Sequence, residues 1–398
     1  MPLICRINKI SFKYDSMLKH LNSYIRDRES RTAGLFFSVN SILFGSWITR
    51  LPDIQERINI GEGELGLALL GLPLGSVTVM PFISYFIQKY GAGRVTIFIS
   101  IIFCIISTLP VFAASHLGLF VILILVGIST GAMDIAMNAA AAIVEEKKGR
   151  PIMSTCHGLW SLGGMIGAAS TSILAGFQVS GKLQMIVLAV LLLIVVWILS
   201  RQMAKIRDVN TEKTRIFVFP RGILIGLALI AFCVMLGESA IMDWSTIYLR
   251  KTLDTEVMLA GMGFAGFSFS MALGRFYGDV LVTKWGTRKL VLIGLVIGIT
   301  GVLSALVIQN SIVAILGFTF AGIGFSNLVP AVYISSAKVP GVSAGEGLAS
   351  VASLGYFGLF VGPPTIGMIA EEYGLNIGLG VVIVLLSIAF LITKRIRF

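Results

Sequence analysis

An aspartate inside a long apolar stretch is the strongest chemical signal in the sequence. Asp134 lies near the middle of residues 117–143, where inserting a charged side chain into a membrane costs roughly 2.5–3.5 kcal/mol. Gly127, Gly131, Asp134 and Asn138 follow one another at steps of four, three and four residues, so they share one helical face. Burial disfavours the charged carboxylate, which makes Asp134 a candidate proton carrier beside an amide that could bind substrate hydroxyl groups. The alternative is an aspartate that only joins helices through hydrogen bonds.

Further ionisable groups lie in other apolar stretches. Glu238 is a second buried carboxylate and a candidate protonation site or substrate ligand. Asp243, closer to the end of the same stretch, is expected to cap a helix or to pair with Arg50 or Arg250. His157 could relay protons to the first aspartate, because an imidazole titrates near neutral pH, and a hydrogen-bonded core histidine is the alternative.

Two more groups of polar residues could act on a solute or on the helices. Arg275 and Asp279 are four residues apart at the end of an apolar stretch, a spacing that favours an ion pair on one helix. Asn40, Asn327 and Tyr356 lie deep in apolar stretches and are candidates, with the amide beside the first aspartate, for binding a polar substrate.

The composition explains which kind of structure must hold these residues. The chain has 398 residues, of which 56% are hydrophobic and 13% charged, with a mean hydropathy of +0.92. A soluble protein carries about 25% charged residues, so this chain must be a membrane protein with many spans. The basic residues that give the net charge of +11 lie between the apolar runs, where they set the orientation of the spans. Nucleic acid is therefore not the expected partner.

The sequence predicts neither an enzyme nor a bound cofactor. Cys5, Cys104, Cys156 and Cys233 lack the spacing of metal ligands, and no set of nucleophile, base and orienting residue is present. No glycine-rich phosphate loop of the ATPase kind occurs, so ATP is not expected to drive this protein directly.

A bilayer core requires about 20 apolar residues for each helix. This length predicts twelve spans, at residues 33–52, 64–87, 94–114, 117–143, 152–177, 183–200, 222–248, 257–282, 288–308, 311–335, 345–369 and 375–393. We predict four parts of the chain: a basic N-terminal segment (1–32), a first six-helix bundle (33–200), a linker (201–220) and a second bundle (221–398).

The basic residues predict the orientation of these spans. Of the 31 Lys and Arg residues, 25 fall on the side that holds the two termini and the linker. Because positive residues stay in the cytoplasm, we expect cytoplasmic termini in a bacterial inner membrane. The apolar residues of the N-terminal segment recur at helical spacing, so this segment is predicted either to lie on the inner membrane surface or to be an unstructured tail.

The two predicted bundles resemble each other in sequence. Lys89-Tyr90-Gly91 matches Lys284-Trp285-Gly286, and Trp47 matches Trp244, at offsets of nearly 200 residues. Two similar six-helix halves that are joined by a linker favour a transporter with its site between the halves, near the middle of the membrane.

With these features the chain resembles the major facilitator superfamily over roughly residues 31–395. The most specific element is Gly274-Arg275-Phe276-Tyr277-Gly278-Asp279, followed by Lys284-Trp285-Gly286-Thr287-Arg288-Lys289; the first half departs from this pattern with Gln88 in place of the acid. The stretch from Gly127 to Gly164 is similar to the fucose-permease-like branch. The resemblance implies the major facilitator fold, a gate formed by Arg275 and Asp279, and proton-driven uptake of small sugars.

We therefore expect an all-α membrane protein with twelve transmembrane helices in two pseudo-symmetric bundles. Its expected function is proton-coupled symport of a small polar, sugar-like solute by a monomer, with protons and the lipid bilayer as its other partners. The alternatives are a proton-driven exporter of drugs or metabolites and a membrane sensor that binds a ligand without moving it. The sequence does not identify the solute, the coupling ion or its stoichiometry.

Overall fold

The computed structural model describes residues 24–206 and 219–396, apart from the side chains of Asp279 and Ala344. In these ranges, twelve helical stretches are long and apolar enough to cross a membrane, which confirms the predicted fold class. The helical elements are α2 (Arg28–Thr49), α3 (Leu51–Ile58), α4 (Glu62–Leu69), α5 (Gly71–Tyr90), α6 (Ala92–Ile106), η1 (Leu109–Phe112), α7 (His116–Lys148), α8 (Met153–Gly176), α9 (Gly181–Met203), α10 (Ile223–Ile247), η2 (Tyr248–Thr252), α11 (Val257–Ala260), α12 (Met262–Trp285), α13 (Thr287–Val307), α14 (Ser311–Phe325), α15 (Leu328–Ser336), α16 (Ala344–Tyr373) and α17 (Leu375–Arg395).

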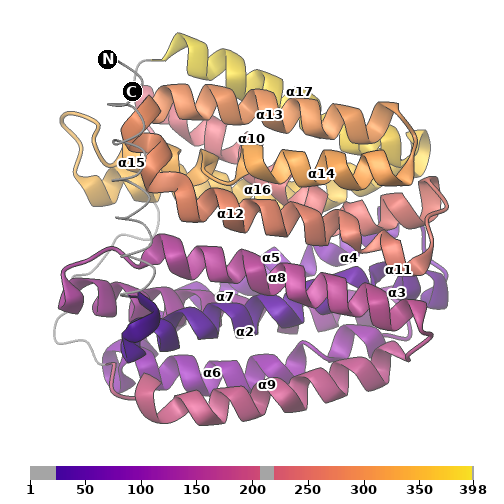
Figure 1. Ribbon diagram of the computed structural model, residues 1–398, viewed down its shortest axis with the longest axis horizontal. Helices are drawn as coiled ribbons and strands as arrows, with labels where there is room; N and C mark the ends of the chain where they lie inside the picture. Colours follow the sequence, from indigo (N-terminus) through magenta and orange to yellow (C-terminus); the bar gives the residue numbers. More distant parts are fainter. Residues whose placement is uncertain (1–23, 207–218, 397–398) are drawn as a thin grey trace, which may run out of the picture.

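The helices gather into two bundles that lie side by side (Figure 1). Helices α2 to α9 form the first bundle and α10 to α17 the second, and the two meet where α8 packs on α12 and α4 packs on α16. We call the end where α2 begins and α17 ends the termini end, at the left of Figure 1, and the opposite end, which holds α3, α4 and α11, the distal end.

Proline explains two interruptions of the spans. A proline has no backbone N–H to donate to the carbonyl four residues earlier, so a helix weakens there. Pro73 follows Leu69 by four residues, and α4 gives way to α5 at Leu70. Pro330 follows Ser326 by four residues, and the break between α14 and α15 falls at residues 326–327.

The two glycines of the stripe around Asp134 bring α7 close to α5. A Cβ atom on Gly127 would collide with the backbone of Leu72, and one on Gly131 would collide with the backbone of Ser76. The glycines therefore permit contact between backbones that larger side chains would prevent. One turn further along the same face, Asp134 lies beyond this close contact.

Ion pairs fix the termini end of the first bundle. Asp27 caps α2 by accepting a hydrogen bond from the Ser30 backbone N–H at 2.9 Å, and it pairs with Lys148 at 2.8 Å. Glu29 pairs with Lys147 at 2.7 Å and with Lys148 at 3.1 Å. Burial alone would raise the pKa of Asp27, but the hydrogen bonds from Lys148 and Ser30 outweigh it and lower the pKa to about 2. The start of α2 is thus tied to the end of α7.

Candidate functional site

Asp134 and Asn138 are in direct contact on α7. The side-chain amide of Asn138 donates to the backbone carbonyl of Asp134 at 2.8 Å and to its carboxylate Oδ1 at 3.0 Å. Both residues are half-buried, and no ion pair joins Asp134 to a basic side chain in the part of the chain that the structure describes. The carboxyl group is therefore held by an amide, which can bond to it in either protonation state.

Two tyrosines of the second bundle interact electrostatically with this carboxyl group. Tyr356 on α16 and Tyr333 on α15 both lie within electrostatic range of Asp134. The side chain of Tyr356 is 39% exposed although it lies near the middle of α16. The carboxyl group of Asp134 on α7 is thus coupled electrostatically to α15 and α16 of the opposite bundle.

An ion pair lies at the centre of the second bundle. The Arg275 guanidinium on α12 pairs with the Glu238 carboxylate on α10 at 3.3 Å, and both side chains are less than 15% exposed. Arg275 also donates across to the first bundle, to the Ser161 hydroxyl at 2.6 Å and to the His157 carbonyl at 3.4 Å. One arginine therefore neutralises an acid and joins the two bundles.

The structure leaves the predicted pair between Arg275 and Asp279 open. The side chain of Asp279 lies outside the described residues, so its gate role stays a prediction. The structure shows that Arg275 pairs with another acid, Glu238. It also shows a bond from Arg275 to Ser161 of the first bundle, which the spacing of residues on one helix did not indicate.

His157 and Asn40 have surroundings typical of packing residues. The His157 ring meets Phe37 edge to face, with ring centroids 5.3 Å apart, and no hydrogen bond links it to Asp134 among the described residues. Asn40 is 2% exposed, donates to the Met133 sulfur at 3.5 Å and accepts from the Trp160 indole N–H at 3.0 Å. The contribution of Asn40 in this arrangement is to orient Trp160, which is itself half-buried.

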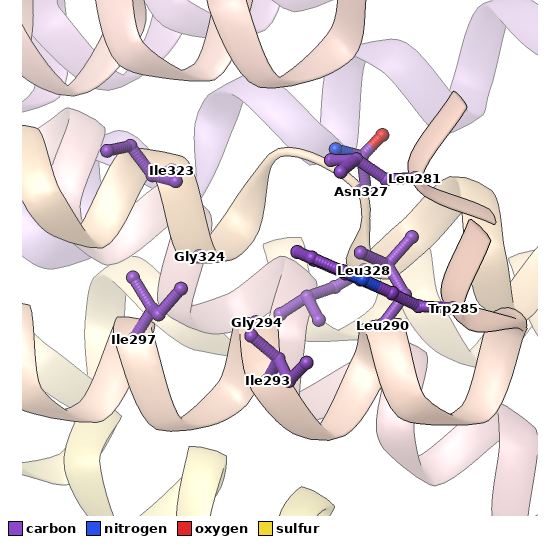
Figure 2. Close-up of a pocket in the computed structure, with 10 residues that line it drawn as sticks. All are labelled: Leu281, Trp285, Leu290, Ile293, Gly294, Ile297, Ile323, Gly324, Asn327 and Leu328. Atoms are coloured by element: carbon purple, nitrogen blue, oxygen red, sulfur yellow. The ribbon is translucent and has the colours of Figure 1, made fainter. Parts of the chain in front are cut away.

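Asn327 also differs from its expected surroundings. Its amide donates to the Gly274 carbonyl at 2.8 Å and to the Ser326 hydroxyl at 2.9 Å, within the second bundle. It lines a side cavity between α12, α13 and α15 (Figure 2). These bonds hold the helix break at residues 326–327 against α12, so Asn327 has a structural task that does not require a substrate.

The distal end of the interface between the bundles is closed. Lys251 pairs with Glu62 at 3.2 Å, and the Gly63 backbone N–H donates to the Glu371 carboxylate at 3.0 Å. The Ser172 hydroxyl of α8 accepts a bond from the Gly261 backbone N–H at 3.0 Å, at the start of α12. Together with the packing of α11 on α8, these bonds hold the two bundles against each other at the distal end.

Several buried polar groups at the distal end have no hydrogen-bond partner among the described residues. They are the indole N–H groups of Trp47 and Trp244, both amide atoms of Gln55, and the hydroxyls of Ser245 and Thr246. Each such group costs roughly 1–3 kcal/mol when it is buried without a partner.

Asp243 is buried in this same region of α10. It is 6% exposed, and no ion pair or hydrogen bond of its side chain is formed with the described residues. The suggested pairing with Arg50 is wrong, because Arg50 instead binds Asp53 at 2.9 Å and Gln184 at 3.0 Å.

Sequence reasoning missed three residues that surround the centre: Tyr333, Trp160 and Ser161. Trp160 and Ser161 lie three and four residues after His157, so they continue its helical face, and this spacing could have indicated that the face is functional. No sequence pattern indicated Tyr333, because its position depends on the break between α14 and α15 in the second bundle.

Comparison with known proteins agrees with this architecture. The sequence profile of the Major Facilitator Superfamily matches residues 33–266 and 227–397. The chain belongs to the major facilitator superfamily. An uncharacterised MFS-type transporter from Yersinia pestis is 32% identical over 352 residues, which cover 88% of this chain and 91% of the relative. This major facilitator protein is therefore a transporter and not an enzyme, as the sequence predicts, whereas the fucose-permease-like branch stays a prediction.

Solved structures share the fold at low identity. A bacterial homologue of the human lysosomal transporter Spinster has a TM-score of 0.73 and 17% identity, covering 91% of this chain and 95% of that one. A variant of the nucleoside transporter NupG has a TM-score of 0.72 and 13% identity, covering 93% of this chain and all of the other. These likenesses establish the major facilitator fold of the chain.

Proposed function

We propose that this major facilitator protein takes up a small, neutral, polyhydroxylated solute together with protons, by alternating access between its two bundles. The observation that carries the proposal is the position of Asp134. It interacts electrostatically with tyrosines of the opposite bundle and forms no ion pair among the described residues. A carboxyl group in these surroundings can take up and release a proton as access to it changes sides.

The charges at the centre favour a neutral solute. Arg275 and Glu238 neutralise each other, which leaves Asp134 as the one described charge there without a partner of opposite sign. An organic anion would be repelled by the charged form of Asp134 and would find the guanidinium already occupied. A sugar or polyol suits the amide of Asn138 and the phenol of Tyr356, which can donate to and accept from hydroxyl groups.

Aromatic side chains add to this preference. Trp160 is oriented by Asn40 at the interface, and Tyr333 lies beside Asp134, so the faces of sugar rings could stack on them. The similarity to the fucose-permease-like branch and the structural likeness to NupG, a nucleoside transporter, both agree with a polyhydroxylated solute.

The closed distal end suggests how access alternates. In a state that opens this end, the Lys251–Glu62 pair and the Ser172–Gly261 bond must break, and water then reaches the unpartnered groups of Trp244 and its neighbours. The hydrogen bond between Arg275 and Ser161, near the centre, would break and form again in each transport cycle. Asp134 would exchange its proton with whichever side is open.

The basic residues support one orientation of this cycle. With 25 of 31 Lys and Arg residues on the side of the termini, that side lies in the cytoplasm of a bacterial inner membrane. The conformation described here is then closed to the outside. We propose that the protein acts as a monomer and that the direction of transport is uptake.

Transport by the purified full chain in liposomes tests the function. An alkaline lumen supplies an inward proton gradient, and labelled sugars, polyols and nucleosides are compared with an organic acid and a lipophilic cationic drug. We expect a neutral polyhydroxylated compound to accumulate, and a protonophore to abolish the accumulation. Gradient-driven movement of the acid or the drug alone would overturn the proposal, and drug export would support the exporter alternative.

A further inference from the structure

A side cavity in the second bundle lies outside the site between the bundles. It has a volume of about 130 Å³ and is enclosed by α12, α13 and the α14–α15 segment. Its lining is apolar apart from Asn327, whose amide is already bonded to Gly274 and Ser326. Figure 2 shows Trp285 reaching from α12 into the space above Ile293 and Leu328.

The cavity opens sideways from the bundle. Helices α12 and α13 both pack closely on α14 but make little contact with each other, which leaves a crevice between them. Ile323, which lines the cavity, is 46% exposed, and Val296 next to the lining residue Ile297 is 45% exposed. In a membrane these apolar surfaces face lipid, so the molecules that meet the opening are acyl chains.

Positive charge surrounds the termini end of the cavity. The ammonium group of Lys284 lies 5.7 Å from the centre of the Trp285 ring, and Lys289 directly precedes the lining residue Leu290. Both lysines are exposed. The Arg288 guanidinium between them donates to the backbone carbonyls of Lys394 at 2.8 Å and Thr393 at 3.1 Å, which holds its charge in place.

Between Asp279 and Glu346 the segment that lines the cavity carries only basic charges. From residue 280 to residue 345 there is no Asp or Glu, although this segment carries Lys284, Arg288, Lys289 and Lys338. A tryptophan beside a cluster of basic residues is typical of the level of the lipid headgroups. The cavity therefore combines an apolar lining with basic residues that adjoin the lining residues Trp285 and Leu290 in the chain.

We propose that this cavity binds one anionic phospholipid, with part of an acyl chain beside Trp285 and Ile293 and the phosphate at Lys284, Arg288 and Lys289. Basic pockets between transmembrane helices recognise anionic headgroups, and each Lys or Arg near the membrane surface contributes about 1 kcal/mol. The lipid would bridge α12 and α13, which contact each other little, and so stabilise the second bundle. The proposal does not depend on which solute the protein transports.

Native mass spectrometry of the detergent-purified full chain tests the proposal. Phosphatidylglycerol and phosphatidylcholine with the same acyl chains are titrated separately, and thermal unfolding is measured in parallel. We expect one phosphatidylglycerol to bind more tightly than the rest and to raise the unfolding temperature. Replacing Lys284 and Lys289 together by Gln should weaken its binding about 25-fold, since each charge accounts for roughly a fivefold change.

Further variants separate the headgroup from the chain. Ile293→Trp should fill part of the cavity and weaken both lipids alike. Lys89→Gln is the matched control, because Lys89 stands at the equivalent place in the first bundle, beside the rings of Tyr85 and Tyr90, and its loss should leave the binding unchanged. Glycerol phosphate, which lacks acyl chains, should not stabilise the protein.

Three results would overturn the proposal. Equal binding of the two lipids would contradict recognition of the charge, and unchanged binding in Ile293→Trp would show that the chain does not enter the cavity. Stabilisation by glycerol phosphate alone would indicate a phosphate site instead of a lipid site.

Discussion

The two acids nearest the centre of the protein, Asp134 and Glu238, have opposite surroundings. Glu238 pairs with Arg275 at 3.3 Å, so its negative charge is compensated. Asp134 bonds to the amide of Asn138 at 3.0 Å and forms no ion pair among the described residues. An ion pair fixes the charge of one acid, whereas the amide leaves the other able to gain or lose a proton. The comparison teaches that acids at similar depth in the two bundles can differ in whether a basic side chain compensates their charge.

The largest effect should follow from neutralising Asp134. One pH unit can drive about tenfold accumulation for each coupled proton. Asp134→Asn should reduce the accumulation ratio in liposomes to one, while exchange of labelled for unlabelled solute continues. Asp254→Asn is the control, since Asp254 is exposed and its φ of 47° suits asparagine equally well. Normal accumulation in Asp134→Asn would remove Asp134 from the mechanism.

Breaking the ion pair tests the other side of the comparison. Arg275→Met leaves Glu238 charged and unpaired near the centre, and the expected loss in the free energy of unfolding is about 3 kcal/mol. The double variant Arg275→Met with Glu238→Met should recover most of this loss, because no unpaired charge remains. Thermal unfolding in detergent measures both. If the double variant is as unstable as the single one, the pair is not the reason for the loss.

Removing one phenol hydroxyl should have a smaller effect. Tyr356→Phe removes a hydroxyl that is coupled electrostatically to Asp134, and we expect the KM for the solute to rise about five- to tenfold, as for one lost hydrogen bond. In the matched variant Tyr248→Phe, the lost hydroxyl donates to the Ala305 carbonyl at 3.1 Å inside the second bundle. That change should lower the stability by about 1 kcal/mol and leave the KM unaltered. An equal rise of KM in both variants would contradict a substrate role for Tyr356.

The smallest effect should come from the distal ion pair. Lys251 and Glu62 are partly exposed, so Lys251→Gln should shift the balance towards distal opening by less than about 1 kcal/mol. The readout is the alkylation rate of a cysteine introduced at Thr246, which lies at the distal interface. Asp53→Asn, which breaks a pair inside one bundle, should leave the rate unchanged. A slower rate in Lys251→Gln would contradict the closing role of this pair.

The spans could be predicted because hydropathy is a local property of the chain. The predicted span 117–143 became α7, which continues to Lys148, and the predicted span 152–177 became α8 with ends within one residue. Helices extend beyond the apolar core wherever charged residues can form helical turns in the headgroup region, and hydropathy does not detect those turns. The contact of Asp134 with Asn138 was also predictable, since one helix fixes the distance between residues four apart.

The rest of the centre depends on contacts between distant parts of the chain. Arg275 and Glu238 are 37 residues apart, and Arg275 and Ser161 are 114 residues apart. Two helices can rotate and slide relative to each other without changing either sequence pattern, so spacing alone did not reveal these partners. Asn40 and Asn327 show the same limit: their depth suggested substrate contacts, which stay a prediction, whereas the bonds of their amides to neighbouring helices could not be read from the sequence.

The sequence by itself determined the class of protein, the number of spans, and the stripe that places Asp134 next to Asn138. The reason is that the length of an apolar run and the spacing of residues on one helix are both properties of short segments. Tertiary structure decided that Arg275 compensates Glu238, that two tyrosines of the other bundle interact electrostatically with Asp134, and that the distal end is closed. These features depend on how twelve helices pack, and packing follows from the shapes and hydrogen bonds of residues that are far apart in the chain.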